Sequence, residues 1–212
     1  AFMANKINFQ KEMDKLLEQN QREARVPSLF LHSCCAPCSS YVIEYLSDYF
    51  QITVFYYNPN IYPDEEYLHR VKEQQHLICQ IPQKYPVSFL EGDFDKERFY
   101  DMAKGLEKIP EGGEVVFSAI GSAGKTAQLA KEHGFDYFCT TLSISPLKNA
   151  QKLNEIGEEL ADTYGIPWLP SDFKKKNGYK RSVELSALYG LYRQDYCGCV
   201  FSKKERETPD CI

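Results

Sequence analysis

Three cysteines within five residues, Cys34, Cys35 and Cys38, directly follow an apolar stretch at residues 26–31. The apolar stretch predicts a buried strand and residues 39–46 predict a helix, so the cysteines fall on a strand–loop–helix turn. In open α/β sheets, the chemistry lies in the loops at the carboxyl ends of the strands. Cys34 and Cys35 can both ligate one metal ion or one iron–sulfur cluster, and a helix N-terminus beside them favours the thiolate.

Two other assignments stay open for these thiols. Cysteine is often buried as a small apolar side chain, so Cys34 and Cys35 could also be two core thiols. Cys38 is either a further ligand or a simple thiol at the start of a helix. Elsewhere, Cys79 lies in an apolar helical stretch and is predicted to be buried, and Cys139 lies in a predicted strand.

A second pair of thiols, Cys197 and Cys199, is separated by Gly198. Glycine allows the backbone to bend until the two sulfurs meet, but a Cys-x-Cys disulfide closes a small ring that should be strained. Strained disulfides are easily reduced, which suits an electron relay better than a structural crosslink. An inert pair of thiols is the alternative.

The composition is typical of one large or two small globular domains. Of the 212 residues, 43% are hydrophobic and 14% aromatic, which is enough for a real core. No apolar run approaches the ~20 residues of a membrane span, and residues 1–6 lack a signal peptide's apolar segment, so we expect a cytoplasmic protein. In that compartment eight cysteines favour metal or redox chemistry over structural disulfides. The net charge of −5 argues weakly against nucleic acid but allows a local basic surface.

Strands and helices alternate along the chain, which predicts a single α/β domain with a mostly parallel sheet flanked by helices. Strands are expected at residues 26–31, 51–57, 87–90 and 135–142, and helices at 5–24, 39–46, 64–80, 96–108, 126–133, 150–164 and 182–189. Within this domain, residues 1–25 form an N-terminal helical segment. Residues 170–212 form a C-terminal basic segment that also carries Cys197 and Cys199.

Together these motifs resemble the cobalamin-independent epoxyqueuosine reductase family (QueH type). The matching stretches are residues 31–38, 57–63, 135–149 and 172–199, and the resemblance covers nearly the whole chain. It implies a HUP-like α/β fold and reduction of epoxyqueuosine to queuosine at the wobble position of tRNA, the final step of queuosine biosynthesis. It also implies a [4Fe-4S] cluster, in some members a neighbouring iron, and no cobalamin.

The resemblance also assigns roles to residues of this sequence. It implies that Cys34 and Cys35 are two cluster ligands and that Cys197 and Cys199 are the redox-active pair. An external reductant would reset the disulfide that this pair forms. Apart from the resemblance, Asp195 and Tyr196 neighbour the pair in the sequence, and either can donate a proton when the epoxide oxygen leaves as water.

A tRNA substrate needs cations and aromatic surfaces, and residues 173–181 contain both. An ordinary solvated lysine face is the alternative. The residues expected to contact tRNA or its modified base are Tyr57 and Asn58 after the second strand, Ser145 and Lys148 after the fourth, and Lys175, Lys176, Tyr179 and Arg181 in the basic segment.

One stretch departs from the family pattern. A four-cysteine cluster needs two more thiolates, which the family places in an Arg-Cys-x-x-Cys-Tyr helix. Those positions are Val116 and Ala119 here, and neither side chain can ligate iron. A local frameshift is one explanation, because with suitable codons a neighbouring reading frame over residues 115–123 encodes the family motif. The chain as written would otherwise be a cluster-deficient or inactive homologue that still binds tRNA.

The same stretch fits a loose phosphate-loop pattern. Residues 119–126 match A-x-x-x-x-G-K-T, and a helix is expected to follow. Such short matches arise by chance, and no apolar strand ending in aspartate supplies a magnesium partner. An ATP-dependent tRNA-modifying protein that uses this loop is therefore the second function class.

Overall fold

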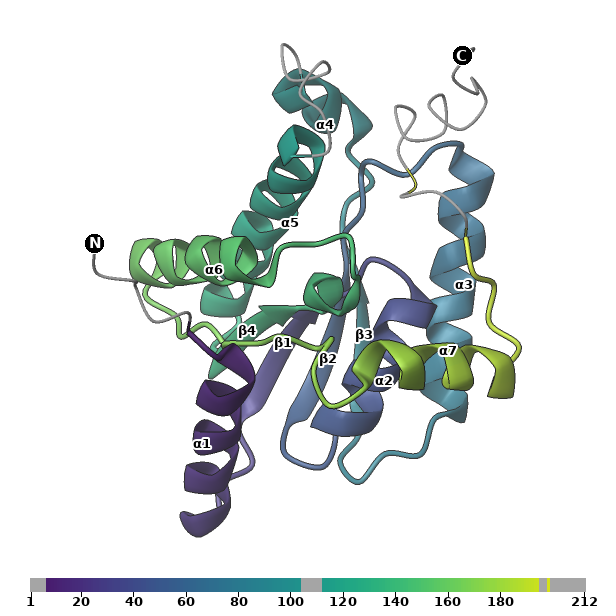
Figure 1. Ribbon diagram of the computed structural model, residues 1–212. Helices are drawn as coiled ribbons and strands as arrows, with labels where there is room; N and C mark the ends of the chain where they lie inside the picture. The colour runs from purple at the N-terminus through teal and green to yellow at the C-terminus, as the bar shows by residue number, and fades with distance from the viewer. Residues whose placement is uncertain (1–6, 104–111, 195–197, 199–212) are drawn as a thin grey trace, which may run out of the picture.

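Four parallel strands form a sheet in the computed structural model, which describes residues 7–103, 112–194 and 198 (Figure 1). The strands are β1 (Ser28–His32), β2 (Gln51–Tyr56), β3 (Val87–Glu91) and β4 (Tyr137–Thr140), in the order β3-β2-β1-β4. Consecutive residues of β1 point to opposite faces, yet Leu29, Phe30 and Leu31 are all fully buried. The sheet is therefore covered on both faces, as parallel sheets generally are.

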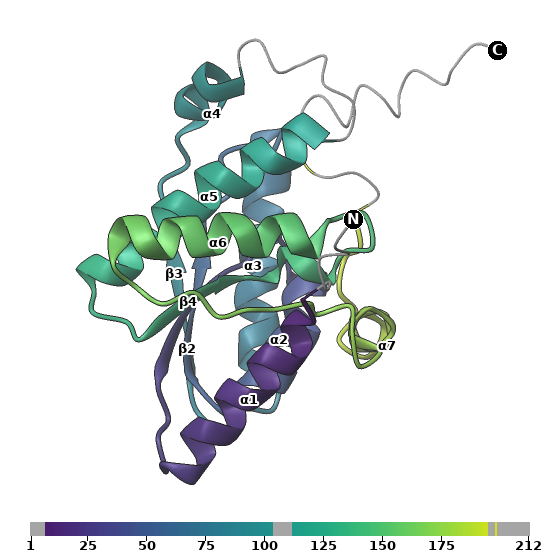
Figure 2. The same cartoon turned by 60° about the vertical axis from the view of Figure 1, so that its left-hand side comes forward.

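Helices cover the two faces unequally. They are α1 (Phe9–Arg22), α2 (Ala36–Leu46), α3 (Asp64–Gln80), α4 (Lys96–Ala103), α5 (Gly112–Glu132), α6 (Ala150–Tyr164) and α7 (Gly178–Leu188), with a 3-10 turn η1 at Thr141–Ile144. The chain crosses from β1 to β3 in one direction and returns to β4 in the other. Right-handed crossovers therefore place α2 and α3 on one face and α5 on the other. Figures 1 and 2 show α7 packed on α2 and α6 packed on α5.

The strand order reverses between β1 and β4. At such a switch point, the loops that follow the two strands lead to opposite faces of the sheet and leave a crevice between them. The loop after β1 is residues 33–35, which carries Cys34 and Cys35, and the segment after β4 is η1. The fold therefore places the cysteine turn at the position where open α/β sheets bind ligands.

The α/β class, the parallel sheet and all four predicted strands are confirmed. The fourth strand is shorter than predicted, because residues 141–144 turn into η1. The helix predicted at 182–189 begins earlier, at Gly178. Within the described residues, no helix combines the length and the apolar character needed to cross a lipid bilayer.

The phosphate-loop prediction is wrong, because residues 119–126 lie inside α5. Backbone N–H groups inside a helix bond to carbonyl groups four residues earlier, so they cannot surround a phosphate. Thr126, which the motif assigns to magnesium, is buried and donates its hydroxyl to the carbonyl of Ser122 at 2.6 Å. The helix begins well before the predicted residue 126. Ala123, Ala127 and Ala130 lie along its buried face, and their small side chains let it pack closely on the sheet.

Two glycines inside helices test this packing. A Cβ atom at Gly157 in α6 would lie 2.2 Å from Cδ2 of Trp168, whereas a Cβ at Gly124 in α5 would come no nearer than 3.9 Å to Leu160. The Trp168 ring cannot easily retreat, because its Nε1 donates to Oδ1 of Asn154 at 2.9 Å.

We expect Gly124→Ala to raise the free energy of unfolding by about 0.5–1 kcal/mol, since alanine favours the helix. Gly157→Ala carries the same propensity gain but overpacks the core, and we expect a net loss of about 1–3 kcal/mol. Urea denaturation of both variants measures the difference. Equal effects at the two positions would contradict the packing of Trp168 on α6.

Candidate functional site

The three cysteines after β1 converge on one point. The Sγ atoms of Cys34, Cys35 and Cys38, the cysteine triad, all lie within 4.8 Å of one another. Extended backbone at Cys35, with φ −169° and ψ 160°, precedes the first turn of α2, which carries Cys38. Across the switch point, Sγ of Cys34 lies 3.7 Å from Oγ1 of Thr141 in η1. Three thiols at this spacing can ligate one metal ion or three corners of an iron–sulfur cluster.

Two other described cysteines lie apart from the triad. Cys139 in β4 is buried, and its thiol faces the Leu169 carbonyl at 3.4 Å and the Ser171 hydroxyl at 3.5 Å. Cys79 is exposed, so its predicted burial is wrong. The two apolar residues before it, Leu77 and Ile78, are buried, and the next helical position turns toward solvent.

Hydrogen bonds couple the three thiols of the triad. Hydrogen bonds from the thiols of Cys34 and Cys38 hold the pKa of Cys35 well below its ordinary value. The hydrogen bond with Cys35 raises the pKa of Cys34. Hydrogen bonds with Cys34 and Cys35 raise the pKa of Cys38. The side chain of Gln194 also hydrogen-bonds to Cys35, which lies at the positive end of α2. Cys35 is therefore the thiol of the triad whose ionised form is favoured most.

A buried histidine joins the strand ends next to the triad. The Nε2 atom of His32 lies 3.1 Å from the Tyr57 carbonyl oxygen, and Nδ1 lies 2.9 Å from Oγ1 of Thr140. A carbonyl only accepts, so Nε2 carries the proton and Nδ1 accepts from the Thr140 hydroxyl. That hydroxyl oxygen also accepts from the Leu142 N–H at 3.3 Å. Burial lowers the pKa of His32 to about 4, and only 2% of the residue is exposed.

The two residues predicted after β2 are buried at the site. Asn58 donates from Nδ2 to the Ser33 carbonyl at 2.8 Å and so ties the cysteine turn to the end of β2. The ring of Tyr57 stacks on the ring of Phe55, and the backbone carbonyl of Tyr57 accepts from Nε2 of His32. Both residues hold the site together here. Their contact with a modified base stays a prediction.

The loop after η1 is held by a lysine of the basic segment. Lys174 Nζ donates to the carbonyl of Ser143 at 2.8 Å and to the carbonyl of Lys148 at 3.2 Å. Ser145 lies between these two carbonyls and is half-buried, as is Lys148. Lys174 is thus a structural residue that fixes the predicted substrate loop beside the switch point.

The other predicted cations divide into two sets. Lys176 pairs with Asp14 of α1 at 2.7 Å. The guanidinium of Arg181 donates to the carboxylate of Glu44 in α2 from Nε at 2.9 Å and from Nη2 at 2.7 Å. These pairs join α7 and the segment before it to α1 and α2. In the second set, Lys175 and Lys180 are exposed and make no ion pair among the described residues, and the Tyr179 ring is exposed beside them.

Polar residues of α3 complete the site, and no sequence motif predicted them. Gln74 and Arg70 are one helical turn apart and almost fully buried, at 0% and 1% exposure. The amide oxygen of Gln74 accepts from the hydroxyls of Ser33 at 2.7 Å and Ser39 at 2.9 Å. Arg70 donates from Nε to Glu66 at 2.7 Å, and its charge attracts the Cys35 thiolate. In the sequence, these two residues could have been found as a glutamine and an arginine at positions where an amphipathic helix normally has apolar side chains.

Gly198, between the two C-terminal cysteines, lies against the start of α3. Its carbonyl accepts from the Tyr62 N–H at 2.7 Å. Its φ of +105° favours glycine, and a Cβ would lie 3.0 Å from Nη1 of Arg70 and 3.2 Å from Cγ1 of Ile61. Gly198 and the triad therefore both neighbour Arg70. The predicted catalytic residues Asp195, Cys197 and Cys199 lie outside the described residues.

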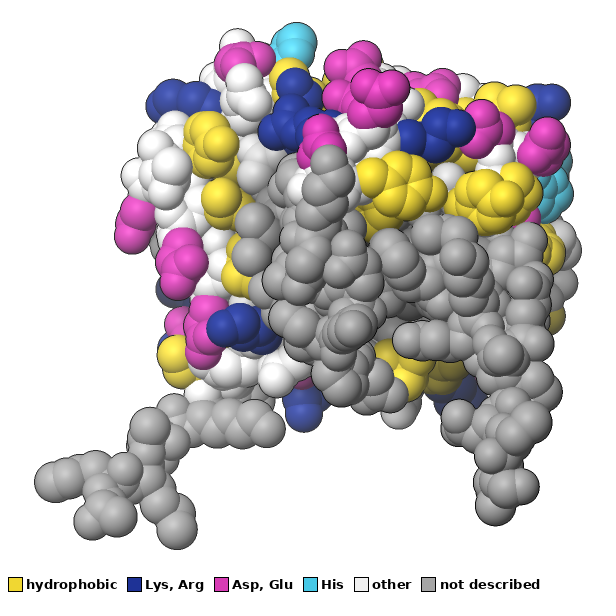
Figure 3. Space-filling view, turned by 90° about the horizontal axis from the view of Figure 1, so that it is seen from above, with side chains coloured by type: hydrophobic (Ala, Val, Ile, Leu, Met, Phe, Trp, Pro, Cys, Tyr) yellow, Lys and Arg dark blue, Asp and Glu magenta, His cyan; other side chains and the backbone are white. Residues whose placement is uncertain are grey.

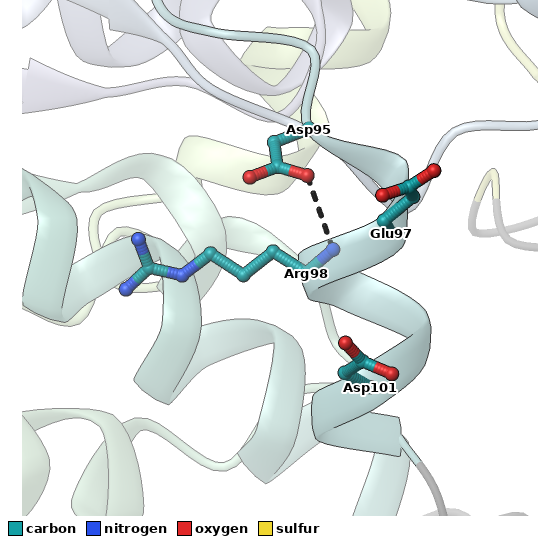
Figure 4. Close-up of a pocket in the computed structure, with 4 residues that line it drawn as sticks. All are labelled: Asp95, Glu97, Arg98 and Asp101. Carbon is teal, nitrogen blue, oxygen red and sulfur yellow. Dashed lines mark hydrogen bonds between the residues drawn. The ribbon is translucent and has the colours of Figure 1, made fainter.

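Figure 3 views the molecule from the end at which the strands finish. Positive and negative side chains are interspersed on the described part of this surface. An open pocket nearby is lined by Asp95, Glu97, Arg98 and Asp101 at the start of α4 (Figure 4). The Asp95 carboxylate accepts from the backbone N–H of Arg98 at 3.1 Å, so it caps the helix. The pocket contains no predicted site residue and no donor directed to the triad.

His32 should make stability depend on pH. Its pKa is lowered from 6.5 to about 4 in the folded protein, so the unfolded chain binds more protons between these values. The stabilisation is complete above pH 6.5 and falls as the pH drops toward 4. We expect His32 to account for a loss of about 2 kcal/mol between about pH 7.5 and pH 5, measured by urea denaturation.

His32→Gln removes this titration while retaining a neutral N–H donor, and should show a correspondingly smaller loss. His76→Gln is the control, because it makes the same replacement at an exposed position of α3. A His32→Gln variant with the full pH dependence of the parent protein would contradict the buried neutral imidazole.

Comparison with known proteins gives the family of this chain. The family model described as "Epoxyqueuosine reductase QueH" matches residues 29–205. Proteins of that name are similar over most of their length: 44% identity over 204 residues for Streptococcus pyogenes serotype M1, covering 94% of this chain and 79% of the relative. The values are 42% over 202 residues for Staphylococcus epidermidis, covering 93% and 85%, and 32% over 183 residues for Thermotoga maritima, covering 84% and 92%. The chain therefore belongs to the epoxyqueuosine reductase QueH family of oxidoreductases.

Proposed function

We propose that this protein reduces epoxyqueuosine to queuosine in tRNA, with the cysteine triad holding an iron–sulfur cluster. The observation that carries the proposal is the convergence of three thiols at the switch point of a sheet, in a chain of this family. The spacing supports metal binding in general, and the family supports the choice of substrate.

The reaction removes the epoxide oxygen and leaves a carbon–carbon double bond. It consumes two electrons and two protons, and the oxygen leaves as water. Oxidation of the Cys197 and Cys199 dithiol to a disulfide supplies both electrons and both protons, so the reaction balances. Asp195 is the proposed donor of one of these protons to the departing oxygen. An external reductant then restores the dithiol.

Cys34 and Cys35 fit two corners of a four-iron cluster, and Cys38 fits either a third corner or an iron beside the cluster. When bound, such a cluster supplies a Lewis acid and an electron carrier. In the protein, Cys34, Cys35 and Cys38 would hold it. His32, Asn58 and the polar face of α3 keep those three cysteines in place.

A second candidate function is tRNA binding without turnover. The favouring observation is chemical: Val116 and Ala119 offer no ligand where the family pattern has cysteine. These positions are three residues apart in the sequence, as are the two cysteines of the family motif. The two candidates differ in iron content and in queuosine formation, and both quantities can be measured on the same preparations.

Restoring the two cysteines tests the reductase proposal. We expect Val116→Cys with Ala119→Cys, reconstituted anaerobically, to hold about four irons per chain. It should form queuosine in epoxyqueuosine-containing tRNA at least about tenfold faster than the parent chain, since a tenfold rate change needs only about 1.4 kcal/mol. Mass spectrometry of the tRNA nucleosides measures the product.

The matched control is Val115→Cys with Ser118→Cys, which adds the same thiols one position earlier and turns them by about 100° around the helix. The control should match the parent chain in iron content and rate. Equal gains in both double variants would contradict a ligand role for positions 116 and 119. No product from any form would contradict the reductase proposal and favour the tRNA-binding candidate.

The two sets of cations should differ in tRNA binding. Lys175→Ala with Lys180→Ala removes exposed charges, and we expect weaker binding and a log–log salt slope that is smaller by about 1–2. Lys176→Ala with Arg181→Ala removes cations that are paired with Asp14 and Glu44. It should lower the melting temperature and leave the salt slope nearly unchanged. Filter binding at several salt concentrations measures the slopes, and the reverse assignment of effects would contradict the division.

A further inference from the structure

Gln74 touches both sides of the cysteine turn. Ser33 immediately precedes Cys34, and Ser39 immediately follows Cys38. The amide oxygen of Gln74 lies 2.7 Å from the Ser33 hydroxyl and 2.9 Å from the Ser39 hydroxyl. All three side chains are fully buried. One side chain of α3 therefore bridges the end of β1 and the first turn of α2, the two elements between which the triad is held.

The bridge competes with local hydrogen bonds. The Ser33 hydroxyl is also 3.3 Å from the Cys35 carbonyl, and the Ser39 hydroxyl is 3.1 Å from the Ala36 carbonyl. Each hydroxyl has one proton to donate, and in both cases the contact with Gln74 is the shorter one. Both serine hydroxyls are therefore assigned as donors to Gln74 of α3 rather than to the carbonyl groups of their own turn.

The nitrogen of the same amide gives a second, independent observation. Nε2 of Gln74 is buried and has no hydrogen-bond acceptor among the described residues. A buried donor without an acceptor lowers the stability of the folded protein. A purely structural bridge leaves this cost uncompensated among the described residues.

We propose that Gln74 is a positioning residue of the metal site, which sets the spacing of the three sulfur atoms through Ser33 and Ser39. This inference rests on the proposed metal binding by the triad. It adds a residue outside the ligand set, on a different helix, whose loss should weaken metal binding without removing any ligand. Outer residues of this kind typically change metal affinity 10–100-fold.

Cobalt(II) alone is the probe, because its thiolate complexes absorb by charge transfer and report both affinity and geometry. We expect the parent chain to bind cobalt(II), and Gln74→Leu to bind it at least about tenfold more weakly with a shifted charge-transfer band. Gln74→Glu retains two oxygen acceptors for the serine hydroxyls and should recover most of the affinity. Gln75→Leu, at the exposed neighbouring position on α3, is the matched control and should match the parent chain.

The outcomes separate this inference from the metal proposal. No cobalt binding by the parent chain would overturn both. Binding by the parent chain that is unchanged in Gln74→Leu would overturn the inference alone. If Gln74→Leu does not fold by circular dichroism, Ser39→Ala decides, because it removes one side of the bridge. Weaker binding in Ser39→Ala supports the inference and unchanged binding overturns it. Where Gln74→Leu and Ser39→Ala both fold, the variant that combines the two substitutions should lose no more cobalt affinity than Gln74→Leu alone, because both act through the same bridge.

Discussion

The neutral imidazole of His32 joins the ends of three strands, and the cysteine turn depends on that contact. His32 belongs to β1 and bonds to Thr140 of β4 and to the carbonyl of Tyr57 beyond β2. Parallel pairing makes this possible, because His32 and Thr140 are register partners at the edge where all the strands end. The next residues along the chain are Ser33 and Cys34, so the position of the imidazole fixes where the triad begins.

Around this contact the protein has two kinds of polar residue with different tasks. On α3, the buried side chain of Gln74 hydrogen-bonds to the cysteine turn. Near α7, the charged side chains of Lys176 and Arg181 are partly exposed to solvent. The ion pairs of Lys176 and Arg181 are partly exposed, so each contributes at most about 1 kcal/mol to stability. Burial of Phe173 and Leu185, both fully inside the core, contributes more to holding this region. The ion pairs mainly set its orientation on α1 and α2.

The strands and the cysteine triad could be predicted from sequence because their signals are local. β2 is a run of β-branched and aromatic residues, and the triad lies within five residues after an apolar strand. The start of α5 was missed because Gly112 and Gly113 favour a loop by propensity, whereas the helix begins at Gly112. Lys176 and Arg181 were predicted to face substrate. Their ion pairs could not be foreseen, because the partners Asp14 and Glu44 are more than a hundred residues away in sequence. Gln74 carries no motif at all, and its role follows from contacts between elements.

The central claim is that the triad is the ligand set of this protein, and anaerobic reconstitution with iron and sulfide tests it most directly. Iron and acid-labile sulfide would be counted in the parent chain and in three single Cys→Ser variants. We expect Cys35→Ser to lose most of the bound iron and sulfide. Cys79→Ser and Cys139→Ser should retain it, because Cys79 is exposed on α3 and the Cys139 thiol faces Leu169 and Ser171. Full iron and sulfide in Cys35→Ser, or their loss in Cys139→Ser, would contradict the account.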